Sequence, residues 1–222
     1  MIVETSSAHP STLGERNLAL MLQRTKTQWG GDKDLWVFGY ASLIWRPEFD
    51  FAERRPARVH GWHRALRMWS HVNRGTEECP GLVFAMLSGG SCQGMVFRIP
   101  QRDAQAALER LWVREMPTPV YDPRWLPCQT DQGPVQALTF TLSRRSPSHT
   151  GALAAHDYQR IFRHANGRYG STRDYAHDTY HGLRAVGIHD RALGRLLELS
   201  RSDGAPGQES VAGSWCNGLE KG

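Results

Sequence analysis

The feature that most constrains the fold is a continuous apolar run at residues 35–40, Leu-Trp-Val-Phe-Gly-Tyr. Such a run is typical of a strand buried on both faces, because a half-exposed strand alternates apolar and polar residues. Five further segments have strand-like patterns: 57–60, 62–70, 81–87, 93–99 and 135–142. Gly61 joins the first two of these, and the turn-forming Ser88-Gly89-Gly90 separates the next two.

Helical patterns dominate after this first half. Residues 103–115 have helical periodicity, whereas the prolines of 117–127 predict an irregular segment. Further helices are expected at 151–164, from Ser171 or Thr172 to about Gly187, and after Asp190. Strands that precede helices predict an α+β fold around a small, mixed, partly closed sheet or barrel. We expect an N-terminal extension at 1–33 with one helix near 15–25, a domain at 34–200 and a loose tail at 201–222.

Bulk properties exclude several classes of protein. No apolar run is long enough to span a membrane, and the N-terminus lacks the pattern of a secretory signal, so we expect a cytoplasmic protein without a membrane partner. The four cysteines are far apart and form no C-x-x-C pair, which argues against a zinc site. The net charge of +5 permits an acidic partner without requiring one.

Glu115 occupies a position where a helix ordinarily places an apolar residue. The apolar stripe of the expected helix comprises Ala104, Ala107, Leu108, Leu111 and Trp112. At about 100° per residue, Glu115 lies within about 60° of Ala104, Leu108 and Leu111. Burial and the negative end of the helix dipole would both raise its pKa, as suits a general acid or base. The alternative is a structural carboxylate paired with Arg110, Arg114 or a distant arginine.

The expected first strand ends in Gly39-Tyr40-Ala41-Ser42-Leu43. Small residues directly after a buried strand let backbone N–H groups turn towards a ligand, where they can bind a carboxylate or stabilise an oxyanion. The alternative is an ordinary tight turn. A different hypothesis makes Ser42 a nucleophile with His63 or His71 as its base, although no G-x-S-x-G motif is present.

Three other patterns have simpler explanations. His177 and His181 have the i, i+4 spacing of metal ligands, but a solvated helix face accounts for them and no H-E-x-x-H motif completes a site. The arginines and tryptophans of 54–69 could bind single-stranded nucleic acid, yet without an RNP-like motif we expect no nucleic-acid partner. Arg74-Gly75-Thr76 lies in a polar loop and could recognise a carboxylate.

Three separated segments carry a further signal. Residues 37–45 read V-F-G-Y-A-S-L-I-W, and residues 111–116 read L-W-V-R-E-M and precede Tyr121 and Pro123-Arg124-Trp125. Residues 166–190 contain Tyr175 and end in G-I-H-D. In order and spacing, these segments and the Arg74 triplet resemble the ChaC-like family of γ-glutamylcyclotransferases, especially its bacterial members. The similarity runs from about residue 36 to 197.

The resemblance implies a γ-glutamylcyclotransferase-like fold and the release of 5-oxoproline and Cys-Gly from glutathione, without metal or cofactor. It places the family's catalytic glutamate at Glu115 and its γ-glutamyl-binding loop at Tyr40, Ala41, Ser42 and Leu43. Tyr121 and Tyr175 match family tyrosines that are candidates for the wall of the site, and Arg74 is a candidate for carboxylate recognition.

One residue departs from the family pattern, because Ala41 stands where the family usually has glycine. A positive φ there would strain alanine by roughly 1–2 kcal/mol, whereas a negative φ would leave only a methyl group that narrows the pocket. Three alternatives to the glutathione assignment stay open: a cyclotransferase for other γ-glutamyl amines or peptides, a serine hydrolase that uses Ser42, and a non-catalytic binding module.

Overall fold

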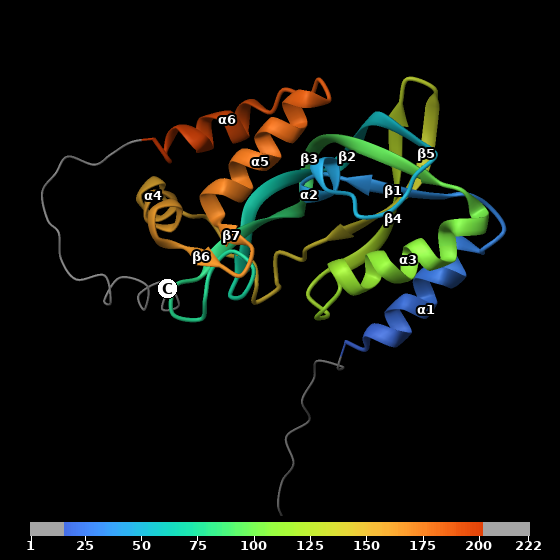
Figure 1. Ribbon diagram of the computed structural model, residues 1–222, viewed down its shortest axis with the longest axis horizontal. Helices are drawn as coiled ribbons and strands as arrows, with labels where there is room; N and C mark the ends of the chain where they lie inside the picture. Colours follow the sequence, from blue (N-terminus) through green and yellow to red (C-terminus); the bar gives the residue numbers. More distant parts are fainter. Residues whose placement is uncertain (1–15, 202–222) are drawn as a thin grey trace, which may run out of the picture.

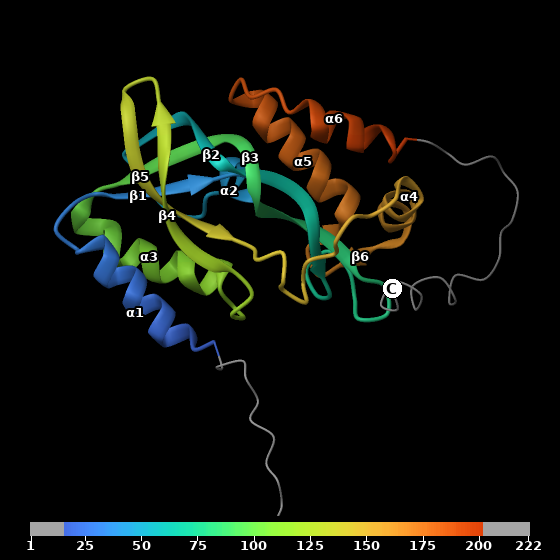
Figure 2. The same ribbon diagram turned by 180° about the vertical axis from the view of Figure 1, so that it is seen from behind.

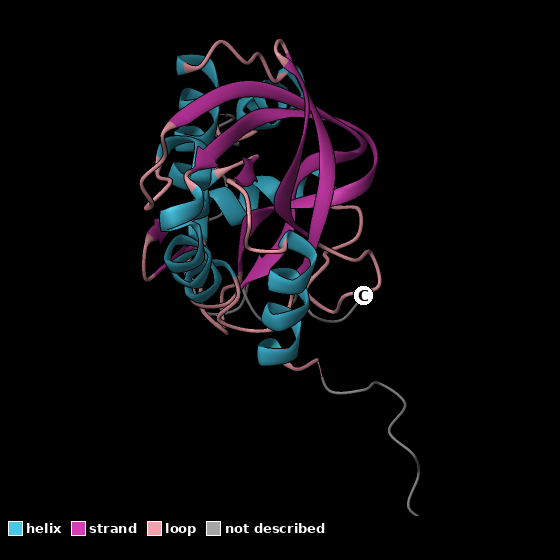
Figure 3. Ribbon diagram, turned by 90° about the vertical axis from the view of Figure 1, so that its right-hand side faces the viewer, coloured by secondary structure: helices cyan, strands magenta, loops and turns pink. Residues whose placement is uncertain are grey.

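The computed structural model of the chain describes residues 16–201, and a closed barrel forms its centre (Figures 1 and 3). Its strands, in barrel order, are β1 (Leu35–Gly39), β3 (Gly81–Ile99), β2 (Glu53–Ser70), β4 (Asp122–Thr130) and β5 (Gly133–Thr141). Parallel pairing of β1 with β5 closes the barrel, and all the other neighbours pair antiparallel. The predicted α+β fold around a small mixed sheet is therefore confirmed.

The helices cover the barrel in two groups (Figures 1 and 2). On one side, α1 (Leu18–Trp29) lies beside α3 (Gln101–Glu115). The other group contains α4 (Ala155–His164), α5 (Thr172–Ala185) and α6 (Arg191–Glu198), together with the hairpin of β6 (Asn166–Gly167) and β7 (Gly170–Ser171). The short helix α2 (Ser42–Trp45) follows β1 and packs against α5. No helix within residues 16–201 is both long enough and apolar enough to cross a membrane.

The predicted breaks in the two longest strands are wrong. Each of β2 and β3 is continuous, and the two pair along almost their whole length. The register shifts between His60 and Trp62, where Gly61 has φ 81° and lies opposite the segment 88–91. Residues 88–90 therefore form a bend within β3 rather than a turn between strands. Such a bulge bends the two-stranded ribbon, and this bending helps so few strands to close a barrel.

The segment 117–127, predicted to be irregular, instead enters strand β4 at Asp122. Two prolines lie within this strand, at Pro123 and Pro127. β4 pairs with β2 only around Cys128 and Gln129, so the rest of β4 has no backbone hydrogen bonds to β2. A strand that is unpaired on one side tolerates residues without an N–H donor.

Helix boundaries agree with the sequence where capping residues define them. Ser171 Oγ accepts a hydrogen bond from Asp174 N at 3.0 Å and caps α5, and Asp190 caps α6. The first helix ends later than expected, at Trp29, and the expected start at Glu15 lies outside the described residues. Trp29 is only 5% exposed, so part of the segment predicted as an extension contributes to the core.

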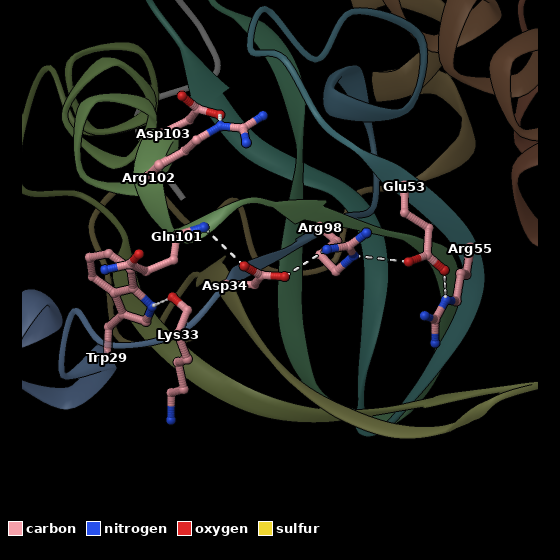
Figure 4. A network of polar contacts seen from close by, with 9 residues as sticks. All are labelled: Trp29, Lys33, Asp34, Glu53, Arg55, Arg98, Gln101, Arg102 and Asp103. Carbon is pink, nitrogen blue, oxygen red and sulfur yellow. Dashed lines mark hydrogen bonds and ion pairs between the residues drawn. The ribbon is translucent and has the colours of Figure 1, made fainter.

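A polar network fixes the start of α3 relative to the barrel (Figure 4). Arg98 on β3 donates to Asp34 Oδ2 at 2.6 Å and to Glu53 Oε2 at 2.9 Å. Asp34 Oδ1 in turn accepts from the backbone N–H of Gln101 at 2.9 Å. Because these side chains are about one-third exposed, each ion pair adds little stability, but together they connect β1, β2, β3 and α3.

The loop between β2 and β3 packs very closely against the start of α5. Thr172 Oγ1 donates to Arg74 O at 3.2 Å and accepts from Leu82 N at 2.8 Å. A Cβ atom on Gly81 would lie 2.0 Å from Arg74 O and 2.5 Å from Thr172 Oγ1. This contact therefore requires glycine, and it determines where Arg74 lies.

Gly81→Ala should destabilise the protein, at or above the upper end of the about 1–3 kcal/mol typical of overpacking. Gly194→Ala is the matched control, because a Cβ there would lie 3.6 Å from its nearest neighbour, within helix α6. Alanine is the better helix former, so this control should stabilise the protein by about 0.5–1 kcal/mol. Chemical denaturation of both variants measures the two effects, and a Gly81→Ala variant as stable as the parent would contradict the packing argument.

Candidate active site

Four of the predicted site residues, from four different parts of the chain, lie close together. Tyr40 follows β1, Glu115 ends α3, Tyr121 precedes β4, and Tyr175 belongs to α5. Burial raises the pKa of each tyrosine, and the nearby charge of Glu115 raises it further. For Tyr175 the resulting pKa is about 12. The site is thus a carboxylate beside three hydroxyl groups that keep their protons at neutral pH.

Glu115 has the raised pKa that its place on the apolar stripe predicts. Its side chain is 18% exposed, and its burial raises the pKa. Arg114 Nε lies 3.0 Å from Glu115 Oε1, and its charge and hydrogen bond partly oppose the rise, whereas Glu48 adds to it. The ion pair expected for a structural carboxylate is therefore present, yet the pKa of Glu115 stays above its ordinary value.

Arg114 also connects the end of α3 to the chain that follows β1. Its Nη1 donates to the backbone oxygens of Arg46 at 2.6 Å and Pro47 at 3.1 Å. Its Nη2 donates to Ser42 Oγ at 3.3 Å. One guanidinium thus holds the carboxylate of Glu115 and the 40–43 loop (residues 40 to 43) in a fixed relation. The sequence identified Arg114 only as a partner of Glu115.

The 40–43 loop does not place Ala41 at a positive φ. Ala41 has φ −143° and is 6% exposed, so the strain considered for a positive φ does not arise and its methyl group is packed. The Ala41 carbonyl accepts from Ile44 N at 2.9 Å, whereas the Ala41 N–H has no acceptor within residues 16–201. Tyr40 is held at both ends, because its hydroxyl donates to Phe140 O at 3.1 Å and its carbonyl accepts from Arg64.

Arg74 borders this cluster. Its guanidinium carbon lies 4.8 Å from the centre of the Tyr175 ring, a cation–π geometry, and Nη1 donates to Tyr169 O. The Phe84 ring packs on Tyr175 at 5.5 Å between centroids. Arg74 is therefore next to the candidate site, and Nη1 of its guanidinium is already hydrogen-bonded to the backbone oxygen of Tyr169.

Neither histidine proposed as a base for Ser42 hydrogen-bonds to it. His63 Nδ1 lies 2.8 Å from Gly89 O, and His71 pairs with Glu77 at 3.3 Å. Ser42 Oγ instead receives a hydrogen bond from Arg114, a cation that cannot accept a proton. Within residues 16–201, the contacts of Ser42 therefore include no general base for the serine hydrolase hypothesis.

The two histidines with metal-ligand spacing lie on α5, on the side of the helix roughly opposite to Tyr175. The rings of His177 and His181 stack with centroids 6.2 Å apart, and His177 Nε2 lies 3.3 Å from Ser200 Oγ. Within the described part of the chain, no group of three or more His, Cys, Asp or Glu side chains could hold a metal ion. This helix face thus has the histidines but no further ligand.

Comparison with known proteins identifies the family. The family model for ChaC-like proteins matches residues 35–203. The chain belongs to this ChaC-like family. The resemblance carried by the sequence motifs is therefore confirmed over the whole barrel and the helices that follow it.

Curated relatives and a solved structure agree with this membership. The ChaC-like chain is 33% identical over 164 residues to the glutathione-specific γ-glutamylcyclotransferase of Escherichia coli K12, across 73% of this chain and 71% of the relative. It is 30% identical over 127 residues to human glutathione-specific γ-glutamylcyclotransferase 1, across 55% of this chain and 57% of the relative. A crystal structure of a yeast γ-glutamyl cyclotransferase specific to glutathione has the same fold, with TM-score 0.70 at 20% identity over 77% of this chain and 96% of that one.

Arg114→Met should raise the pKa of Glu115, because it removes the cation that favours the charged carboxylate. Arg114→Lys should raise it less, since the positive charge remains. The exposed Arg110 lies on the same helix, so Arg110→Met is the control and should leave the pKa unchanged. Carbon-13 NMR titration of the glutamate carboxyl groups measures all three. A Glu115 pKa that is unchanged or lower in Arg114→Met would contradict this electrostatic account.

Proposed function

We propose that this chain is a glutathione-specific γ-glutamylcyclotransferase that converts glutathione into 5-oxoproline and Cys-Gly. Membership of the ChaC-like family and the names of the curated relatives support the activity. The observation that carries the mechanism is the raised pKa of Glu115 beside Tyr40, Tyr121 and Tyr175. A carboxylate in such a place suits proton transfer at neutral pH.

The reaction needs no nucleophile from the enzyme. The α-amine of the substrate attacks its own γ-carbonyl carbon, a five-membered ring forms, and the bond from that carbon to the cysteinyl nitrogen breaks. Holding the amine against the carbonyl supplies much of the rate, because effective molarities of well-oriented intramolecular reactions reach about 10⁵–10⁸ M. This chemistry fits a site in which Ser42 has no base and no metal ligand set lies near Glu115 among the described residues.

Glu115 would act as the proton carrier. As a carboxylate it takes a proton from the α-ammonium and makes the amine nucleophilic. As a carboxylic acid it returns that proton to the departing cysteinyl nitrogen, so that Cys-Gly leaves as an amine. The regenerated carboxylate takes the second proton from the ring nitrogen, which leaves 5-oxoproline as a neutral lactam, and that proton ends on the amine of Cys-Gly. A raised pKa serves both steps, because the group must accept and release a proton within one turnover.

The 40–43 loop would hold the γ-glutamyl group. The Ala41 N–H has no acceptor within residues 16–201, so it is available to the substrate oxygen that becomes negative in the transition state. Tyr121 and Tyr175 would form the wall of the site and donate hydrogen bonds from neutral hydroxyls. Arg74, beside Tyr175, is the candidate for recognising a substrate carboxylate.

Glu115→Gln should fold normally and lose turnover of glutathione by about 10²–10⁴-fold, the usual contribution of a positioned general base. Burial holds the pKa of Glu115 above its value in the unfolded chain, so the ionised carboxylate costs stability once the pH exceeds the unfolded pKa. The uncharged amide removes that cost, and the melting temperature at pH 7 should not fall. Release of 5-oxoproline and a thermal melt test both points. A stable variant with nearly full activity would exclude Glu115 as the proton carrier.

N-acetylglutathione and α-linked Glu-Cys-Gly should not react. The first lacks the attacking amine, and the second presents a different scissile carbonyl. Among true γ-glutamyl compounds, glutathione should have a higher kcat/KM than γ-glutamyl-alanine, because binding of the Cys-Gly part can assist the chemical step. Equal values would favour a cyclotransferase for γ-glutamyl amines in general, and turnover of N-acetylglutathione would exclude the cyclisation mechanism.

Ser42→Ala should keep activity within about 10²-fold of the parent, because it removes one hydrogen bond from a charged donor, worth about 1.5–3 kcal/mol. A serine hydrolase would lose about 10⁶-fold in kcat when its nucleophile is removed. The size of the loss in a glutathione assay therefore separates the two mechanisms.

A further inference from the structure

One buried guanidinium outside the tyrosine cluster contacts the 40–43 loop through its backbone. The side chain of Arg64, on β2, is only 4% exposed. Its Nη1 donates to Tyr40 O at 2.7 Å and to Gln93 O at 3.1 Å. Its Nε donates to Asp190 Oδ2 at 3.1 Å, and Nη2 pairs with the same oxygen. Arg64 thus joins β2, β3, the end of β1 and the start of α6.

The bond to Tyr40 also fixes the direction of the next amide. The Tyr40 carbonyl and the Ala41 N–H belong to one peptide unit, and no peptide bond within residues 16–201 is cis. In a trans unit these two groups point in opposite directions, so the Ala41 N–H points away from Arg64. A charged donor on the carbonyl side also polarises the unit and strengthens its N–H as a donor.

Asp190 keeps Arg64 in this orientation. Its Oδ2 pairs with Arg64, while its Oδ1 accepts from Leu193 N at 2.9 Å and caps α6. Burial alone would raise the pKa of Asp190, but Arg64 and the amides of Leu193 and Ala192 lower it. The carboxylate is therefore ionised at neutral pH. A buried guanidinium that lost this partner would be poorly compensated and free to turn.

We infer that Arg64 and Asp190 are positioning residues for the proposed cyclisation: they orient and polarise the Tyr40–Ala41 peptide, whose N–H meets the developing oxyanion. This inference rests on the proposed function. Neither side chain touches the reacting atoms in this account. Because the oxyanion forms only in the transition state, loosening the pair should lower kcat more than it changes KM.

Asp190→Asn is the sharpest kinetic test. The asparagine oxygen can still cap α6, but the charge that holds Arg64 is lost. Removing an oxyanion donor costs about 10²–10³-fold in kcat, so misaligning one should cost about tenfold, with KM for glutathione within about threefold. Arg64→Lys keeps the charge but cannot reach both Tyr40 O and Asp190, and it should lower kcat about 10²-fold.

Arg98→Met is the control, because it breaks the ion pairs to Asp34 and Glu53 (Figure 4) and should leave kcat unchanged.

A spectroscopic measurement tests the same inference without activity. Tyrosine labelled with carbon-13 at the carbonyl and alanine labelled with nitrogen-15 give a carbonyl–amide correlation only at Tyr40–Ala41 and Tyr175–Ala176. The first correlation should shift in Asp190→Asn and Arg64→Lys and stay in place in Arg98→Met. The second lies within α5 and serves as the internal reference.

The outcomes separate this inference from the proposed function. Absence of 5-oxoproline release by the parent protein would reject the function and, with it, the catalytic role of the pair. If the parent is active and loses activity in Glu115→Gln, the function stands. Parental kcat in folded Asp190→Asn and Arg64→Lys, an unmoved Tyr40–Ala41 correlation, or an equal loss in Arg98→Met would then overturn the positioning role alone.

Discussion

Two long strands, β2 and β3, pair from Glu53 with Arg98 at one end to Ser70 with Gly81 at the other, and the site depends on this pairing. The bulge at Gly61 bends the ribbon so that β1 and β5 can complete the barrel. Arg64 lies just beyond the bulge and reaches Tyr40, and the loop at the end of the ribbon brings Arg74 onto Tyr175. One continuous ribbon therefore supplies two of the cationic groups that border the candidate active site.

Periodicity in the sequence located Glu115 because the buried face of a helix can be read from the spacing of residues within that helix. The stripe of Ala104, Leu108 and Leu111 is buried, and a carboxylate in line with it must share that environment. Tyr121 and Tyr175 came from resemblance to a family, since a tyrosine in an irregular segment or on an apolar helix face has no pattern that separates a site residue from a core residue. Membership of the ChaC-like family now supports that resemblance, and the roles of these residues remain proposals.

The sequence could not reveal Arg64 or Arg114 as connecting residues. Their partners are backbone oxygens of Tyr40 and Arg46, which lie 24 and 68 positions away and leave no residue-type signature. The misassigned breaks have a related cause. Glycines at 89 and 90 interrupt an apolar pattern equally in a turn and in a bulge, and only the pairing with β2 decides between them. The prolines at 123 and 127 led to a wrong prediction of irregular structure for the same reason. They are tolerated in β4 because most of β4 has no hydrogen-bonded partner on the β2 side, which only the assembled barrel shows.

The electrostatics of the cluster suit a reaction in which the substrate supplies its own nucleophile. The pKa values of all three tyrosines are raised, so their hydroxyl groups remain protonated and can only donate or accept neutral hydrogen bonds. Glu115 is the carboxylate beside them, and burial raises its pKa towards neutral pH. The charge and hydrogen bond of Arg114 partly oppose this rise in the pKa of Glu115. A carboxylate that carries protons from the attacking nitrogen to the leaving nitrogen suits an intramolecular cyclisation.

The 40–43 loop also explains why one glycine of the family pattern can be replaced and another cannot. A Cβ atom on Gly39 would lie 2.9 Å from Leu43 Cβ and 3.2 Å from Phe97 Cε2, so the chain can turn there only with glycine. Ala41 has φ −143°, so its position does not require the positive φ that favours glycine. The path of the loop is set by the close approach at Gly39 and by the hydrogen bond from Arg64 to Tyr40 O. The methyl group of Ala41 is packed within this loop, where Ala41 is 6% exposed.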